Sequence, residues 1–61
     1  MADKLKVQER IEGKTPNGGA YSIAYYQDEY GDPIEKSKAT MVEIVEYDNN
    51  DNHVARTYGA L

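Results

Sequence analysis

Residues 28–37, DEYGDPIEKS, set the spacing of this chain, because residues 48–57, DNNDNHVART, repeat their pattern twenty positions later. Each stretch is a polar loop followed by an alternating segment. Only one position is identical, so the two stretches are not a duplication. The positions that match in kind are Asp28 with Asp48, Asp32 with Asn52, Ile34 with Val54, Lys36 with Arg56 and Ser37 with Thr57. This shared pattern predicts two hairpins of similar geometry.

Two further strands are predicted upstream of the first loop. Residues 20–27 are rich in aromatic and β-branched side chains, which favour strands. Their alternation defines two faces, one with Tyr21, Ile23 and Tyr25 and the other with Ser22, Ala24 and Tyr26. Residues 4–12 also alternate, which is typical of a half-exposed antiparallel strand. The segment GKTPNGG at 13–19 consists largely of turn formers and predicts the hairpin loop between them.

Residues 33–47 carry competing signals. Asp32, Pro33 and Glu35 suit a helix cap, a first helical position and a capping-box acid, which favours a helix over 33–45. The β-branched and aromatic residues that follow favour a strand over 39–47 instead, and the twenty-residue spacing supports the strand.

The predicted fold is therefore mainly β, a small antiparallel meander of four to five strands forming an open curled sheet or a half-barrel. The alternative is a four-strand sheet with one helix over 33–45. We expect one domain over residues 1–61, with residues 1–3 disordered.

Residues 46–59, EYDNNDNHVARTYG, resemble the tyrosine–aspartate hairpin of YD-repeat proteins. Asp51 occupies the place of the family's usual loop glycine. The resemblance covers about a quarter of the chain, and a single copy does not make a repeat array. It implies a hairpin here and carries no function.

The chain has little material for a hydrophobic core. It has 61 residues, of which only eleven after Met1 are larger aliphatic ones. A core of this size rarely supplies more than about 3–5 kcal/mol without a disulfide, a metal or a partner subunit. We therefore expect some tyrosines to be buried, and we expect association with another protein or with a second copy.

Charge, composition and the first ten residues argue against several classes of protein. The net charge of −4 argues against nucleic acid, because Lys and Arg supply most of the affinity for phosphates. The absence of cysteine excludes disulfides and thiolate metal sites. The sequence MADKLKVQER at residues 1–10 contains no apolar run, so we expect neither a secretory signal nor a membrane span. We therefore expect a cytoplasmic protein.

No set of residues predicts catalysis, a cofactor or a metal. The only histidine, His53, lies among Asn and Asp residues without a motif around it. Asp48, Asn50 and Asn52 have the spacing of calcium ligands in an EF-hand loop. However, His53 and Gly59 stand where that loop needs glycine and glutamate, so these residues predict a turn. We expect a protein that is not an enzyme.

The six tyrosines are the only large aromatic residues of the chain. We expect Tyr21 and Tyr25 in the core. Tyr26 points to the opposite face, Tyr30 lies in a loop, and the predicted strand over 39–47 is apolar on both faces. The predicted protein-binding residues are therefore Tyr26, Tyr30, Met41, Val45 and Tyr47. The competing interpretation is that the long stems of Lys and Arg cover these rings.

These patterns are consistent with three functional hypotheses. The first is a small acidic interaction module, an accessory or regulatory subunit that binds a larger protein through an exposed face of tyrosine and aliphatic residues. The second is a structural homodimer that uses the same face or a sheet edge. The third is an acidic inhibitor that imitates nucleic acid.

Overall fold

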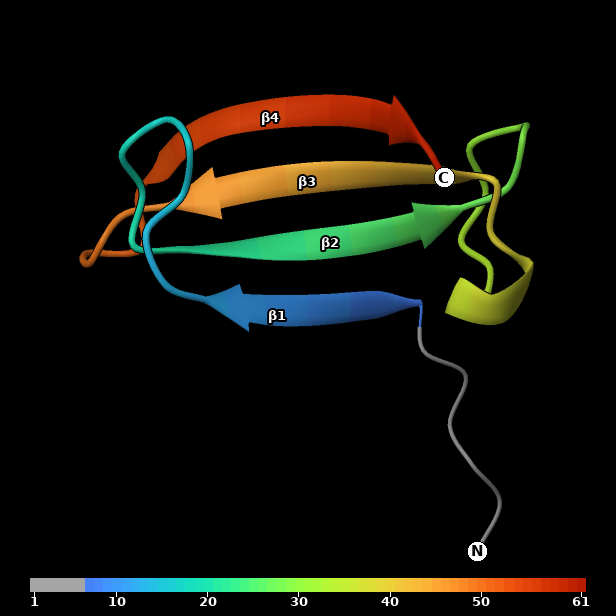
Figure 1. Ribbon diagram of the computed structural model, residues 1–61, viewed down its shortest axis with the longest axis horizontal. Coiled ribbons are helices and arrows are strands. Elements are labelled where there is room, and N and C mark those ends of the chain that lie inside the picture. Colours follow the sequence, from blue (N-terminus) through green and yellow to red (C-terminus); the bar gives the residue numbers. More distant parts are fainter. Residues whose placement is uncertain (1–6) are drawn as a thin grey trace, which may run out of the picture.

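The computed structural model describes residues 7–61, which form one antiparallel sheet (Figure 1). The strands, adjacent in sequence and in space, are β1 (Gln8–Glu12), β2 (Tyr21–Gln27), β3 (Met41–Tyr47) and β4 (His53–Ala60). The predicted antiparallel meander is confirmed, with four strands. The sheet is open and uncurled, with β1 and β4 as its edges, so it does not form a half-barrel.

Part of the first predicted strand, residues 4–6, lies outside the described residues, and so does the expectation of disorder at 1–3. Within residues 7–61, no helix is long and apolar enough to cross a membrane.

The alternative of a helix over 33–45 is wrong. The only helical residues there are Lys36–Lys38, a single 3-10 turn labelled η1. Glu35 before this turn is extended (φ −62°, ψ 149°) and makes no side-chain cap. Residues 41–47 instead pair on both sides as β3, the conformation that suits their β-branched side chains.

Three turns of one design connect the sheet. In each five-residue turn, the backbone N–H of the first residue donates to the carbonyl of the fifth, and the carbonyl of the first residue accepts the N–H of the fourth. This is the pattern of a three-residue hairpin loop. The side-chain oxygen of the first residue also accepts the N–H of the fifth. The turns occupy residues 15–19, 28–32 and 48–52. The predicted similarity of the second and third is confirmed, whereas the twenty-residue spacing does not include the first.

The fourth residue of each turn has a positive φ, 88° at Gly18, 84° at Gly31 and 64° at Asp51. Residues with a Cβ rarely adopt a positive φ. Within the described residues, Asp51 is the only non-glycine residue that does.

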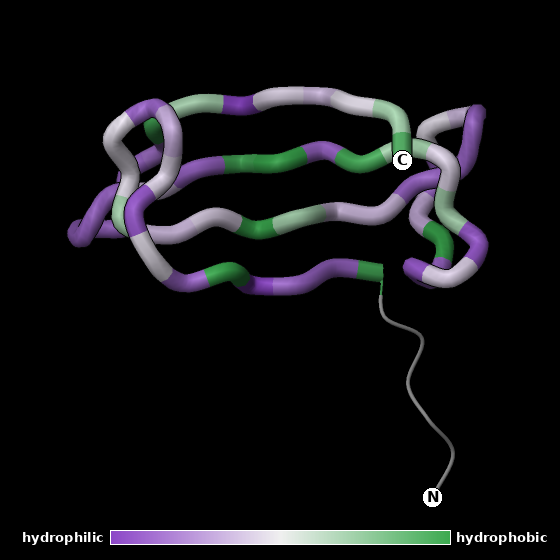
Figure 2. Tube along the Cα trace, in the orientation of Figure 1, coloured by the Kyte–Doolittle hydropathy of each residue, from purple (hydrophilic) through white to green (hydrophobic). Residues whose placement is uncertain are grey.

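The pairing registers divide the side chains between two faces, as the sequence alternation predicted. We call one the tyrosine face; its members on the three strands β2, β3 and β4 include Tyr21, Ile23, Tyr25, Met41, Glu43, Val45, Tyr47, Arg56 and Tyr58. We call the other the loop face; it includes Ser22, Ala24, Tyr26, Val42, Ile44 and Glu46. Figure 2 shows that hydrophobic residues concentrate along β3 in the middle of the sheet, whereas the turns are mostly hydrophilic.

The connection between β1 and β2 folds onto one end of the loop face. There the carboxylate of Glu46, only 2% exposed, accepts hydrogen bonds from the backbone N–H of Asn17 at 3.1 Å and from its Nδ2 at 2.6 Å. Hydrogen bonds from the Thr15 and Asn17 side chains lower the pKa of Glu46. A buried carboxylate therefore fastens this loop to β3.

The connection between β2 and β3 folds onto the other end of the same face. The backbone N–H of Ile34 donates to the carbonyl of Tyr26 at 3.2 Å, and Pro33 forms an isolated bridge with Gln27. Lys36 Nζ lies 5.5 Å from the centre of the Tyr26 ring. The two connections thus lie over the two ends of the loop face, and Val42 and Ile44 between them are half-buried. Among residues 7–61, no helix or strand lies over the tyrosine face.

Candidate protein-binding surface

The five predicted binding residues do not form one patch. Met41, Val45 and Tyr47 lie on the tyrosine face, Tyr26 lies on the loop face, and Tyr30 lies in the turn at 28–32. Tyr30 is 80% exposed, as a binding residue needs to be. Tyr26 pairs with Val42 and shares its face, a register that neither strand reveals alone.

Tyr26 is buried within this chain and does not present its ring to a partner. It is 5% exposed, and its hydroxyl donates to Glu9 Oε1 at 2.7 Å. The hydrogen bond with Glu9 and burial both raise the pKa of Tyr26. The expectation that Tyr26 belongs to an exposed surface is wrong, because the β2–β3 connection folds over it and Lys36 covers its ring.

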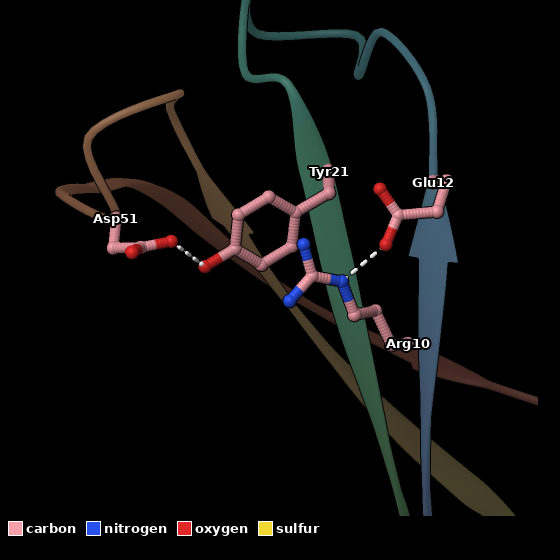
Figure 3. A network of polar contacts seen from close by, with 4 residues as sticks. All are labelled: Arg10, Glu12, Tyr21 and Asp51. Carbon is pink, nitrogen blue, oxygen red and sulfur yellow. Dashed lines mark hydrogen bonds and ion pairs between the residues drawn. The ribbon is translucent and has the colours of Figure 1, made fainter.

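Tyr21 is buried, as expected, beneath the guanidinium of Arg10 (Figure 3). The guanidinium carbon of Arg10 lies 3.9 Å from the ring centre, and Arg10 pairs with Glu12 on the same strand. The Tyr21 hydroxyl donates to Asp51 Oδ1 at 2.6 Å, which raises the pKa of Tyr21. Cationic groups thus lie over two tyrosine rings, Arg10 over Tyr21 and Lys36 over Tyr26, and of these two tyrosines only Tyr26 is a predicted binding residue.

The remaining rings extend along the tyrosine face. Tyr47 stacks on Tyr21 with ring centres 5.3 Å apart and an interplanar angle of 19°. His53 meets Tyr47 edge to face at 6.3 Å. Offset stacking and edge-to-face contacts are the arrangements that aromatic rings prefer, so this row holds together the end of the sheet where β2 begins and β3 ends.

A hollow of about 280 Å³ lies beside this row. Its lining includes Tyr25, Glu43, Val45, Tyr47 and Arg56. Tyr25, expected in the core, is only half-buried, and this burial is the main cause of its raised pKa, with Tyr47 beside it. Val45, which also lines the hollow, is only 4% exposed.

A polar pair lines the hollow. Glu43 Oε2 lies 2.9 Å from Arg56 Nε, and Glu43 Oε1 accepts a hydrogen bond from Gln27 Nε2 at 3.2 Å. The pair is partly exposed, with Arg56 more exposed than Glu43. The ion pair and the hydrogen bond hold these polar groups in place among the apolar residues that line the hollow.

Sequence reasoning missed Tyr25, Glu43, Arg56 and Tyr58 as members of this surface. It locates their strands but not the register of β3 on β4. That register is Val45 opposite Arg56 and Glu43 opposite Tyr58, and it depends on an irregularity at Glu46 and Tyr47 that offsets β4 by one residue.

The acidic turn at 48–52 uses its oxygens for its own backbone. Asp48 Oδ1 accepts the N–H groups of Asn50 at 2.8 Å and Asn52 at 2.9 Å. These hydrogen bonds lower the pKa of Asp48. Within residues 7–61, no three His, Asp or Glu side chains are grouped to hold a metal ion.

No family model, curated protein or solved structure matches this chain. Its function is therefore inferred from the geometry of the two faces.

Proposed function

We propose that this protein is a small interaction module without catalytic activity, which binds another protein through its tyrosine face. The observation that carries the proposal is a central strand, β3, with apolar residues on both sides, in a sheet whose two long connections both fold onto the same side. Met41 and Val45 point to the opposite side. A strand of this kind belongs under a second layer, and a partner can supply that layer.

The composition of the tyrosine face supports a protein as the partner. Tyrosine, methionine and arginine are enriched in protein interfaces, and all three occur on this face, with Tyr25, Tyr47 and Arg56 around the hollow. The hollow has room for a few side chains of a partner. Val45 in its lining is apolar, and its Glu43–Arg56 pair offers hydrogen bonds.

Charge distribution disfavours the third hypothesis, imitation of nucleic acid. At least four of the acids form ion pairs with bases, which are Glu12 with Arg10, Glu9 with Lys36, Glu35 with Lys38 and Glu43 with Arg56. A surface of alternating sign does not reproduce a row of phosphates.

The test is affinity capture from source cells, followed by calorimetry with the purified partner. Tyr25→Ser and Met41→Ser alter the tyrosine face. We expect each to weaken binding about tenfold or more, as for a residue at the centre of an interface. Circular dichroism checks that both variants stay folded.

Tyr30→Ser is the matched control, because Tyr30 is exposed but lies in a turn away from that face. We expect it to change the affinity by less than about twofold, as for a position outside the interface. A partner whose affinity depends on Tyr30 but not on Tyr25 or Met41 would overturn the proposal, as would the absence of any partner at stoichiometric yield.

A further inference from the structure

The two edges of the sheet differ in how well they resist pairing with another strand. Edge strands are protected when they are short and carry charged side chains. The edge strand β1 has five residues, QERIE, of which three are charged. The other edge strand, β4, has eight residues, HVARTYGA, with one formal charge at Arg56 and no proline or lysine.

The backbone of β4 has hydrogen-bonding groups directed outward along its outer side. The N–H of Leu61 donates inward to the carbonyl of Thr40 at 3.0 Å. Inward and outward groups alternate along an antiparallel strand, so Gly59 and Thr57 also bond inward to β3. The residues between and beside them direct their N–H and C=O groups outward; these are Arg56, Tyr58 and Ala60. These three outward residues can therefore pair with a further strand.

We infer that β4 pairs antiparallel with β4 of a second copy of this chain, with the two-fold axis at Thr57, to form a continuous eight-stranded sheet. The occupant is the chain itself because a single unprotected edge gives a closed pair. The protected edge at β1 prevents further copies from adding at the far side, so the assembly stops at two.

Charge selects the register. Outward groups must face outward groups, so the axis can fall on Arg56, Thr57 or Tyr58. An axis at Arg56 sets two guanidinium groups directly opposite each other, which is unfavourable. An axis at Tyr58 leaves Arg56 opposite Ala60 of the second copy and pairs fewer residues of β4.

An axis at Thr57 pairs most of β4 and sets Arg56 of each copy opposite Tyr58 of the other. Tyr58 is 61% exposed in the single chain, and its ring provides a face for the guanidinium. On the loop side, small residues meet: Thr57 faces Thr57, and Ala55 faces Gly59. A Cβ added at Gly59 would have open space within its own chain, so a substitution there can probe the pairing.

This inference concerns the sheet edge, whereas the proposed function concerns the tyrosine face, so the two can fail separately. The first test is the molecular mass in solution by light scattering from low micromolar to millimolar concentration. We expect twice the chain mass of 6.9 kDa at the upper end. A mass that stays at 6.9 kDa throughout would overturn the inference and leave the proposed function standing.

The second test fixes the register with a single cysteine, since the chain has none of its own. Opposite residues that do not share hydrogen bonds have Cα atoms about 4.5 Å apart, which suits a disulfide. Thr57→Cys should therefore oxidise to a covalent dimer in high yield. Thr40→Cys, at an exposed threonine outside β4, should not.

Ala55→Cys alone should also remain a thiol, but an equimolar mixture with Gly59→Cys should form the mixed disulfide. If Ala55→Cys cross-links as well as Thr57→Cys, or if Thr57→Cys does not cross-link in a protein that is dimeric, the register is wrong and the inference is overturned.

The third test reverses charge across the pair. Tyr58→Lys sets two positive charges opposite each other twice in the dimer and should raise its dissociation constant roughly tenfold. Adding Arg56→Glu should restore the dimer, because the new carboxylate at position 56 then faces the new ammonium group at position 58 of the second copy. Dissociation that the double variant does not reverse would contradict the pairing of these positions.

Discussion

The turns at 28–32 and 48–52 have the same backbone conformation. They differ in the residue at the fourth position, where φ is positive. In both, an aspartate at the first position accepts two backbone N–H groups through Oδ1. Both have a positive φ at the fourth position, which is Gly31 in the turn at 28–32 and Asp51 in the turn at 48–52. A shared anchor is therefore enough to form the turn, with or without glycine.

The contact that Asp51 makes explains why an aspartate can stand where glycine fits the backbone better. Asp51 accepts the hydroxyl of Tyr21 at 2.6 Å, a contact that glycine cannot make. The turn at 28–32 leads into Pro33 and η1, whereas the turn at 48–52 joins β3 directly to β4. The strained aspartate thus ties the β3–β4 hairpin to β2, and the unstrained glycine makes no such tie.

The largest expected effect on stability comes from placing valine at the fourth position of the turn at 28–32. A β-branched residue tolerates positive φ poorly, so Gly31→Val should lower the free energy of unfolding by about 2 kcal/mol. Gly59→Val, in β4 with open space around its Cβ position, is the control and should change it by less than about 0.5 kcal/mol. Urea unfolding at low protein concentration measures both. Equal effects at the two positions would mean that φ at Gly31 does not limit the turn.

The next effect comes from removing the shared anchor. Asp28→Ala leaves the N–H groups of Tyr30 and Asp32 without their acceptor and should lower stability by about 1 kcal/mol, as for loss of a helix cap. Asp48→Ala should lower it further, because Asp48 also accepts Asn52 Nδ2 at 3.3 Å. Thermal unfolding compares the two variants. The reverse order would show that the additional hydrogen bond from Asn52 Nδ2 does not stabilise the turn at 48–52.

Stability should also fall in acid, because the carboxylates of Asp48 in the turn at 48–52 and of Glu46 on β3 both accept hydrogen bonds. Hydrogen bonds lower the pKa values of Asp48 and Glu46 below their ordinary values of 3.8 and 4.5. A depressed pKa contributes stability above the ordinary value, and this contribution is lost as the pH falls through the folded-state pKa.

The free energy of unfolding should therefore decrease as the pH is lowered below about 4.5. Asp48→Asn should flatten the part of that decrease that lies below about 3.8. Urea titrations at a series of pH values measure the slope. A slope that Asp48→Asn and Glu46→Gln both leave unchanged would exclude these two groups as its source.

The smallest effect is expected at Asp51 itself. Asp51→Gly relieves the positive φ but loses the hydrogen bond from Tyr21, so the net change should be within about 0.5 kcal/mol of zero. In the background of Tyr21→Phe, where no hydroxyl remains, Asp51→Gly should stabilise the protein by up to about 1 kcal/mol. The same response in both backgrounds would show that Tyr21 and Asp51 are not coupled.

Sequence patterns predict much of this fold because they are local. The alternation of polar and apolar residues locates the strands and their faces, and the spacing of aspartates locates two turns of one kind. The segment TPNGG at 15–19 is predicted only as a hairpin loop, because threonine there takes the anchoring role of aspartate.

The tyrosine face is harder to predict because it joins residues from different strands. Tyr47 and Met41 are placed on one face by alternation, but Arg56 and Tyr58 join them only through the register that the irregularity at Glu46 and Tyr47 sets. Whether this surface binds a protein stays a prediction. Tyr26 is misplaced from sequence because its burial comes from a connection, not from its own strand.

The conformational preferences of neighbouring residues are enough to specify the strands, the side of each strand on which a residue lies, and the turns. Which face is covered depends instead on contacts across the fold. Both long connections fold to the same side, where the buried carboxylate of Glu46 and the ring of Tyr26 hold them. These contacts join residues far apart in the chain, so no local pattern contains them, and they leave the tyrosine face and the edge of β4 open to partners.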